Sequence, residues 1–221
     1  MDCLLCGSKN TQIYREFEEK TYGKLRRWKY FTCQNCDLIF RDPTQRPKPE
    51  EEQSRYKEHQ NLWNKTYEKY LNELWQPLSS YIPKEAKKGL DFGCGATEGL
   101  KELLKDSSYS IESYDFYFKD DVLKNSEYDF VYCSEVVEHF YNVKRNFDIL
   151  IDTLKAGALL AVSTQKPPAD PEDFQTWYYR KDPTHVAFYN SKTWDWIAES
   201  MGFEVLYQEN PIVILKKEKL K

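Results

Sequence analysis

From Gly89 onward, short apolar runs alternate with longer segments whose apolar residues have helical spacing. The runs predict β-strands at residues 89–92, 110–115, 128–133, 158–164, 203–207 and 212–215. The segments between them predict α-helices at residues 98–105, 143–154 and 193–200. This alternation is typical of a mostly parallel sheet that is covered on both faces, so we expect an α/β fold.

One connection in this pattern is short. The interval between Asp115, at the end of the second predicted strand, and Asp129, in the third, cannot hold a full helix and another strand. We therefore expect the sheet to be shortened after its second strand, with only a short turn or helix around residues 120–124.

Two smaller zones precede this domain, which we place at residues 84–221. Residues 1–46 alternate polar and aromatic positions and end in a turn-rich stretch, which predicts a small β-rich module. Residues 47–83 predict one long linking helix, followed by a short turn to Pro83. A stripe of four aromatic residues and one leucine lies at helical spacing: Tyr56, Trp63, Tyr67, Tyr70 and Leu74. The aromatic residues either pack this helix on the main domain or line a substrate site.

Four cysteines form two pairs, Cys3-x-x-Cys6 and Cys33-x-x-Cys36. Two tight turns that each offer two thiolates complete a tetrahedral Zn²⁺ site, so we expect a zinc ribbon over residues 1–46. Because thiolates fill all four positions, a structural role is favoured over a catalytic one, and rubredoxin-like iron is the alternative metal. Metal binding would supply much of the folding energy of so small a module.

Composition limits the classes of partner. Aromatic residues make up 16% of the chain and charged residues 31%, so the chain is expected to fold although only 40% of it is apolar. The formal net charge of −4 disfavours general nucleic-acid binding. With no export signal and no run of apolar residues that could span a membrane, we expect a soluble, cytoplasmic protein. The oligomeric state is left open.

One short stretch is basic and aromatic, although the chain as a whole has a negative net charge. Arg26, Arg27 and Lys29 flank Trp28 and Tyr30 in the predicted ribbon. Such a group can bind single-stranded RNA or an anionic substrate, or it can be the charged, solvated edge of a hairpin.

The segment after the first predicted strand reads Asp91-Phe92-Gly93-Cys94-Gly95-Ala96-Thr97-Glu98. Gly93 and Gly95 allow the backbone to approach a ligand closely, but Glu98 and Asp91 disfavour a pyrophosphate. A cationic ligand fits better, and Asp91 can anchor an ammonium group. Asp115, at the end of the next strand, is placed to accept hydrogen bonds from ribose hydroxyls.

Together these features resemble class I S-adenosylmethionine-dependent methyltransferases over about residues 60–215. The resemblance rests on LDFGCG at 90–95, the Asp115 strand end, YDFVYCSEVVEHF at 128–140, LKAGALLAVST at 154–164 and the C-terminal strand pair. It implies a Rossmann-like fold with S-adenosylmethionine as cofactor, and it places Cys94, Cys133, Ser134 and Glu135 beside that cofactor. The cysteine module is similar to one that precedes some small-molecule methyltransferases. The short segment after Asp115 leaves the adenine-binding residue in doubt, with Asp121 as a weak candidate.

Two histidines are candidate general bases, since imidazole titrates in the useful pH range. His139 follows the strand at 128–133, and His185 lies in the long segment after the strand at 158–164. Either one can instead have a structural role, and His59 on the linking helix is expected to be inert. The aromatic residues around His185 are predicted to form the wall of the acceptor pocket, chiefly Tyr178, Tyr179 and Tyr189.

The sequence thus predicts an S-adenosylmethionine-dependent methyltransferase that acts on a small molecule. One alternative is an RNA methyltransferase that grips RNA through its zinc ribbon. The other is a zinc-ribbon interaction protein on a methyltransferase-like domain without catalysis, against which the intact loop glycines and acidic residues argue.

Overall fold

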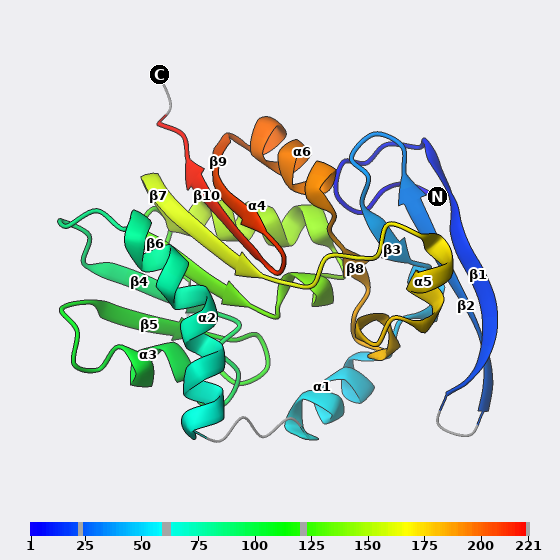
Figure 1. Ribbon diagram of the computed structural model, residues 1–221, viewed down its shortest axis with the longest axis horizontal. Coiled ribbons are helices and arrows are strands. Elements are labelled where there is room, and N and C mark those ends of the chain that lie inside the picture. Colours follow the sequence, from blue (N-terminus) through cyan, green and yellow to red (C-terminus); the bar gives the residue numbers. More distant parts are fainter. Residues whose placement is uncertain (22–23, 59–62, 120–122, 220–221) are drawn as a thin grey trace.

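The computed structural model describes residues 1–21, 24–58, 63–119 and 123–219, and two sheets organise them (Figure 1). The larger sheet has six strands in the order β5-β4-β6-β7-β10-β9. Strands β4 to β7 are parallel to one another, and β10 runs antiparallel to both of its neighbours. Their bounds are β4 (Lys88–Phe92), β5 (Ser110–Tyr114), β6 (Tyr128–Ser134), β7 (Leu154–Ser163), β9 (Phe203–Glu209) and β10 (Ile212–Lys217). The predicted, mostly parallel α/β sheet is confirmed.

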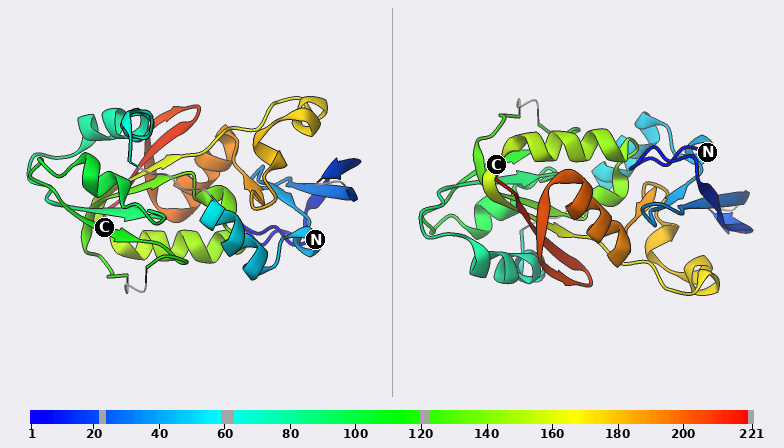
Figure 2. Two further views of the ribbon diagram at one scale, coloured as in Figure 1. Left: turned by 90° about the horizontal axis from the view of Figure 1, so that it is seen from below. Right: turned by 90° about the horizontal axis from the view of Figure 1, so that it is seen from above.

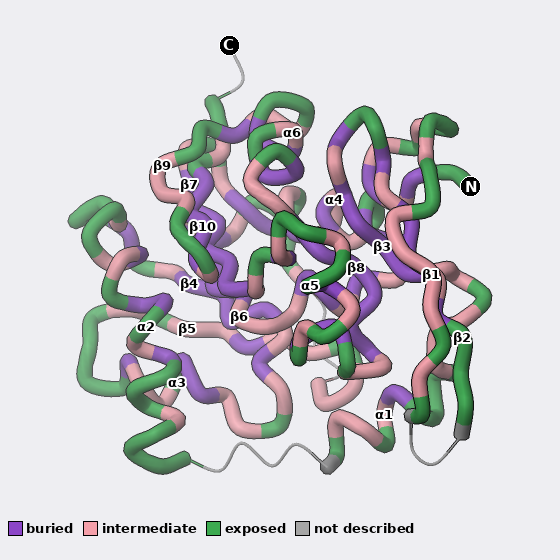
Figure 3. The backbone as a smooth tube through the Cα atoms, turned by 45° about the vertical axis from the view of Figure 1, so that its right-hand side comes forward, coloured by how far each residue is buried: buried purple, intermediate pink, exposed green. Residues whose placement is uncertain are grey.

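Helices cover both faces of this sheet (Figure 2). On one face α2 (Lys65–Tyr81) and α3 (Gly99–Leu103) pack against Phe130 and Tyr132 of β6. On the other face α4 (Val143–Thr153) and α6 (Ser191–Met201) share a core with Val131 and Cys133 of the same strand. Successive residues of a strand point to opposite faces, which explains why β6 is buried on both sides. Figure 3 shows this burial along the central strands.

The chain between β5 and β6 is short, as predicted. Among its described residues, 115–119 and 123–127, there is no strand. Strand β5 therefore forms one edge of the sheet. Asp121 and most of the turn predicted at residues 120–124 lie outside the described residues.

The prediction of one long linking helix is wrong. The structure has two helices here, α1 (Pro49–Glu58) and α2, and the chain before α2 is extended at Asn64. The Asn64 side chain accepts hydrogen bonds from the backbone N–H groups of Thr66 and Tyr67, at 2.9 and 3.0 Å, and so begins a new helix. Helix α2 also continues through Pro77 to Tyr81. His59 lies outside the described residues.

The N-terminal module forms an antiparallel sheet whose fourth strand comes from far away in the sequence. Its order is β1 (Thr11–Thr21), β2 (Lys24–Cys33), β3 (Ile39–Arg41) and β8 (Ala187–Phe188), and η1 (Pro43–Gln45) follows β3. Strand β8 ends a long segment after β7 that also forms α5 (Pro171–Thr176) and η3 (Tyr179–Lys181). Leu5, Phe31 and Leu38 of the module belong to the same apolar core as the main sheet.

Two buried arginines hold the segment after β7 against the N-terminal sheet. Arg41 donates to the backbone carbonyls of Arg180 and Asp182, each at 3.1 Å. Arg180 makes a two-pronged ion pair with Glu19, with both N···O distances at 2.7 Å. Each arginine is 1% exposed, so charged hydrogen bonds, not apolar contacts alone, hold this segment against the N-terminal sheet.

None of the helices within the described chain is long and apolar enough to cross a lipid bilayer.

Candidate functional site

A cavity of about 1780 Å³ lies at the carboxyl ends of β4, β5 and β6. Ligands bind at this edge in open sheets of this kind, because loops after neighbouring strands converge there. Here α1 and α2 line one side of the cavity and the segment around η3 lines another. The cavity is larger than the 300–1,000 Å³ typical of a pocket for one small ligand.

The glycine loop after β4 forms one wall. Gly93 has φ +79°, and a Cβ atom there would lie 2.4 Å from Val136 Cγ2, so only glycine fits. Gly95, at φ +63°, donates its backbone N–H to Asp115 Oδ2 at 2.9 Å. Both glycines, Cys94 and Asp115 line the cavity, as does Asp91 at the base of the loop.

Asp91 supplies a buried negative group at this wall. Burial raises the pKa of its carboxyl group to about 7, and repulsion from Asp115 and Glu98 acts in the same direction. A hydrogen bond from the Leu100 N–H, at 3.3 Å, opposes this rise. A carboxylate in this setting gains from a cationic partner, which suits a ligand with an ammonium group.

Asp115 links the two turns at this edge of the sheet. Its Oδ1 accepts hydrogen bonds from the N–H groups of Tyr117 and Phe118, at 2.8 and 3.2 Å. Together with the bond from Gly95 they hold the carboxylate at the cavity wall, where its remaining lone pairs can accept from a hydroxyl group.

Glu98 does not face the cavity, contrary to the expectation that it would meet the ligand. Its carboxylate pairs with Lys119 at 2.9 Å and with Lys101 at 3.7 Å. Its backbone is left-handed, with φ +48°. Of Asp91 and Glu98, only Asp91 lines the cavity.

The turn after β6 forms the next wall. The Ser134 hydroxyl lies 3.1 Å from the Tyr70 hydroxyl, and Glu135 adopts a left-handed φ of +55°. Burial raises the pKa of Glu135 to about 7. Ser134 and Glu135 line the cavity, whereas Cys133 is fully buried in the core and is not part of its wall.

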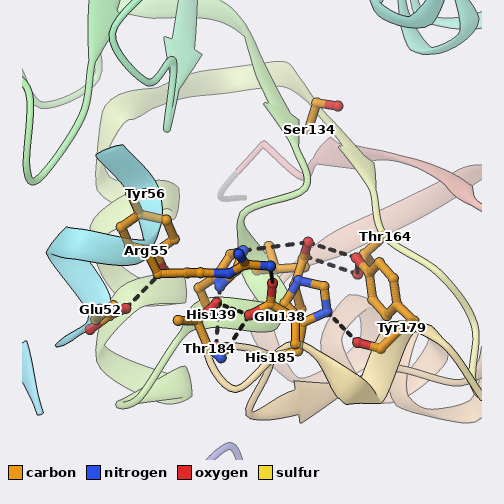
Figure 4. A network of polar contacts seen from close by, with 12 residues as sticks. Glu52, Arg55, Tyr56, Ser134, Glu138, His139, Thr164, Tyr179, Thr184 and His185 are labelled. Atoms are coloured by element: carbon orange, nitrogen blue, oxygen red, sulfur yellow. Dashed lines mark hydrogen bonds and ion pairs between the residues drawn. The ribbon is translucent and has the colours of Figure 1, made fainter. Parts of the chain in front are cut away.

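The structure brings His139 and His185 together at the far end of the cavity, with 4.7 Å between ring centroids (Figure 4). The His139 Nδ1 lies 3.1 Å from the Thr184 carbonyl oxygen. The His185 Nδ1 lies 2.7 Å from the Tyr179 carbonyl oxygen. Carbonyls only accept hydrogen bonds, so each Nδ1 is the protonated nitrogen. Burial and the nearby His139 lower the pKa of His185 to about 3, so its ring is neutral.

Glu138 lies beside these histidines and was not singled out from the sequence. It is fully buried and accepts hydrogen bonds from the hydroxyls of Tyr179 and Thr164, at 2.6 and 3.0 Å. Burial raises the pKa of Glu138 well above its ordinary value, and Glu135 adds to the rise. The one feature of the sequence that could have indicated a role for Glu138 is its position next to His139. No helical or strand pattern there predicts that Glu138 is buried.

Of the three tyrosines predicted for the acceptor wall, two line the cavity and one lies in the apolar core. Tyr178 and Tyr179 line the cavity. Tyr189 does not: its ring stacks on Trp194 with centroids 5.0 Å apart, and its hydroxyl donates to the Val137 carbonyl at 2.8 Å. The structure thus places Tyr189 in the apolar core.

Helix α1 supplies Glu52 and Arg55 to the cavity, which the sequence did not predict, beside Tyr56 of the predicted stripe, whose Tyr67 and Tyr70 on α2 also line the cavity. Buried Glu52 accepts hydrogen bonds from the hydroxyls of Tyr56 and Tyr117, both at 2.8 Å. Arg55 reaches Asp182 at 3.2 Å, so α1 is tied to both sides of the cavity (Figure 4). Tyr56 also packs edge-on against His139, with centroids 5.2 Å apart. Because α1 has few apolar residues, its sequence pattern does not reveal where it packs.

The four N-terminal cysteines converge as predicted from their spacing. Their sulfur atoms lie within 4.8 Å of one another, with Cys3 to Cys36 at 3.5 Å and Cys6 to Cys33 at 3.4 Å. Sulfurs around a tetrahedral zinc ion, at about 2.3 Å from it, lie about 3.8 Å apart. The cluster therefore fits a metal site with four cysteine ligands.

The basic and aromatic group on β2 does not form a stacking platform. Trp28 and Tyr30 are buried against Phe174 and Phe188 of the segment after β7. Arg27 pairs with Glu16 on β1 at 2.6 Å. These rings are therefore not available to stack on nucleic-acid bases.

Comparison with known proteins agrees with this geometry. Residues 56–208 match a family described as a methyltransferase domain. Because this match covers most of the chain, the protein belongs to this methyltransferase-domain family. A search of curated proteins finds no match.

Solved structures share the fold at low sequence identity. An S-adenosylmethionine-dependent methyltransferase from Archaeoglobus fulgidus is 17% identical, with a TM-score of 0.52 over 68% of this chain and 94% of that one. The Burkholderia thailandensis 1,6-didemethyltoxoflavin-N1-methyltransferase is 9% identical, with a TM-score of 0.57 over 91% and 99%. The [4+2]-cyclase SpnF is 12% identical, with a TM-score of 0.53 over 72% and 83%.

Proposed function

We propose that this protein transfers a methyl group from S-adenosylmethionine to a small-molecule acceptor. The observation that carries this proposal is the cavity that connects the glycine loop to the pair formed by His139 and His185. Its volume leaves room for a nucleoside cofactor and a second small molecule. The cofactor supplies an electrophilic methyl group, so the protein's main task is to align the acceptor with it.

The residues at the loop end suit the cofactor. Asp91 would bind the ammonium group, and Asp115 would accept hydrogen bonds from ribose hydroxyls. Gly93 and Gly95 would allow close approach of the backbone, with Ser134 and Glu135 beside them. Each of these residues lines the cavity.

The other end of the cavity is the proposed acceptor site. His139 and His185 lie there with Tyr178 and Tyr179 in the wall. With both Nδ1 atoms bound to carbonyls, each Nε2 carries the lone pair. His139 would receive the acceptor's proton, because a pKa of about 3 makes His185 too weak a base and leaves it a positioning role. A small acceptor is favoured over RNA because Trp28 and Tyr30 are buried and the chain has a net charge of −4. The toxoflavin-type methyltransferase that shares the fold has a small molecule bound.

We further propose that Cys3, Cys6, Cys33 and Cys36 hold a structural zinc ion. Four thiolates leave no open position on a tetrahedral ion, and the cluster packs into the core and not along the cavity.

The cofactor assignment can be tested by calorimetry with S-adenosylhomocysteine. The wild-type chain should bind it, and Asp115→Ala should weaken binding at least tenfold, because the ribose would lose its acceptor and the glycine loop its anchor at Gly95. Asp195→Ala, an exposed change on α6, is the control and should bind like wild type. Absence of binding by the wild-type protein would refute the proposed function.

A further inference from the structure

We propose that Glu138, His139 and His185 bind a divalent transition-metal ion at the acceptor end of the cavity. Their nearest ligand atoms all lie within 4.8 Å of one another. Atoms that share one ion at about 2.1 Å lie about 3.0–3.4 Å apart, so the three side chains need to close by at most about 2 Å. This site is separate from the cysteine cluster.

The two imidazoles are oriented as metal ligands usually are. In metal sites a ligating histidine usually donates its other N–H to a carbonyl or carboxylate, which fixes the ring and its tautomer. His139 and His185 both show this arrangement, with Thr184 and Tyr179 as the carbonyl partners. The Nε2 atom of His139 is then turned to the Glu138 carboxylate, 3.9 Å away.

The buried carboxylates at this site also favour a cation. Glu138 is fully buried, and Glu135 lies beside the same Tyr179 hydroxyl. Within the described residues, the only basic nitrogen within 4.0 Å of the Glu138 carboxylate is that of His139. Burying carboxylates without a full positive charge is costly, and a divalent ion would provide it. The hydrogen bonds from Tyr179 and Thr164 need not break, since each carboxylate oxygen has two lone pairs.

The donor set indicates the kind of ion. Two imidazoles and a carboxylate suit first-row ions such as Mn²⁺, Fe²⁺, Co²⁺ or Zn²⁺, and this triad leaves coordination positions open. His139 and His185 line the cavity, so the open positions would face it.

Such an ion narrows the class of acceptor, a step that rests on the proposed function. An open metal position would take an oxygen of the acceptor and lower the pKa of its hydroxyl group. The hydroxyl proton would pass to water, and the oxygen would form the new O–CH₃ bond. The S–CH₃ bond would break with its electron pair left on sulfur, releasing neutral S-adenosylhomocysteine. The two histidines would then act as ligands and not as the base.

The test is a titration of the full chain, zinc-loaded at its cysteines, with Mn²⁺ while the signal of free Mn²⁺ is followed by electron paramagnetic resonance. Thiolates disfavour Mn²⁺, so the cysteine cluster does not interfere. We expect about one bound Mn²⁺ per wild-type chain, and at least tenfold weaker binding by Glu138→Gln and by His185→Gln. Glu138→Gln keeps the side-chain shape and an acceptor for the Tyr179 hydroxyl, so the fold should be retained.

Glu112→Gln is the matched control. Glu112 also accepts a tyrosine hydroxyl at 2.6 Å, from Tyr128, but it lies outside the cavity and should leave Mn²⁺ binding unchanged. No Mn²⁺ binding by the wild-type chain, or Mn²⁺ binding by the Glu138 and His185 variants equal to that of the wild type, would overturn the proposal. Bound Mn²⁺ should also enhance water proton relaxation, and an ion without exchangeable water would overturn the acceptor assignment.

Calorimetry with S-adenosylhomocysteine on the same samples separates the two proposals. Cofactor binding without Mn²⁺ binding would refute the metal site alone. Mn²⁺ binding without cofactor binding would refute the methyl-transfer proposal and leave the metal site standing.

Discussion

At the scale of single residues, the cofactor end of the cavity combines backbone freedom with one buried charge. Gly93 adopts a positive φ where any larger residue would strike Val136. Asp91, two residues before Gly93, is 5% exposed, and burial raises the pKa of its carboxyl group. The ionised form of Asp91 is therefore unfavourable in the protein without ligand, and a bound cationic ligand would offset this cost.

Asp91→Asn should stabilise the protein without ligand and weaken cofactor binding. An acid with a pKa near 7 when folded and 3.8 when unfolded binds more protons in the folded state, so stability falls as pH rises from about 4 to about 7. At pH 8 the variant should gain on the order of 2–4 kcal/mol in unfolding free energy, and at pH 4 almost nothing. Thermal denaturation at both pH values measures the gain, and calorimetry with S-adenosylhomocysteine should show weaker binding. A gain that is equal at pH 4 and pH 8 would contradict this account.

At the scale of elements, the segment between β7 and α6 does most to complete the site. It leaves the main sheet, forms α5 and η3, and pairs through β8 with β3 of the N-terminal sheet. This path places the His185 ring against His139 and the Tyr179 ring against His185. The N-terminal module thus shapes the acceptor end without lining it directly.

Glu19→Gln tests the junction that holds this segment. The change removes the charge partner of buried Arg180, whose remaining acceptors are the carbonyls of Phe174 and Gln175. We expect a loss of about 1–3 kcal/mol in unfolding free energy at pH 7. The hydrogen bond from Arg180 lowers the pKa of Glu19, so its contribution is present above about pH 4.5 and is lost as pH falls through the lower, folded value.

Glu18→Gln is the control for this change, because Glu18 is exposed on the same strand. Urea denaturation at pH 7 and at pH 3 measures both variants. A Glu19→Gln protein as stable as the Glu18→Gln protein at pH 7 would show that the pair does not hold the junction.

At the scale of the whole molecule, the N-terminal module and the main sheet share one apolar core. Cys33, Leu38 and Phe40 pack in the same cluster as Val131, Leu160 and other central strand residues. The backbone of Lys144 on α4 also donates to the Leu4 carbonyl at 3.0 Å. Loss of order at the cysteine cluster should therefore reach the main sheet.

Cys6→Ser should destabilise the entire chain in one transition. The change removes one ligand of the proposed zinc site, and metal binding at such structural sites contributes on the order of 10 kcal/mol to folding. We expect zinc content, measured by mass spectrometry, to fall by one ion per chain, with a single calorimetric transition at lower temperature. Cys94→Ser, outside the cluster, should keep its zinc. Two separate transitions in the Cys6→Ser protein would show that the module folds independently of the main sheet.

Sequence reasoning reached the features that depend on neighbours in the chain. Strand and helix positions follow from hydrophobic periodicity, and the glycine loop, Asp115 and the two cysteine pairs follow from short motifs. The predictions were wrong where a local helix cap decides where a helix begins, or where a contact distant in sequence decides which way a side chain points. Asn64 splits the linking helix, Glu98 turns to two lysines, and Tyr189 packs in the core.

The amino-acid sequence by itself determined the order of strands and helices, the loop that suits a cationic cofactor and the metal-binding spacing, because each depends on residues only a few positions apart. Only the tertiary structure decided that the Glu138 carboxylate lies beside His139 and His185, and that α1 lines the same cavity as these two histidines. Those contacts join segments far apart in the chain, and side-chain burial and hydrogen bonding across the fold select them. No periodicity within one segment encodes them.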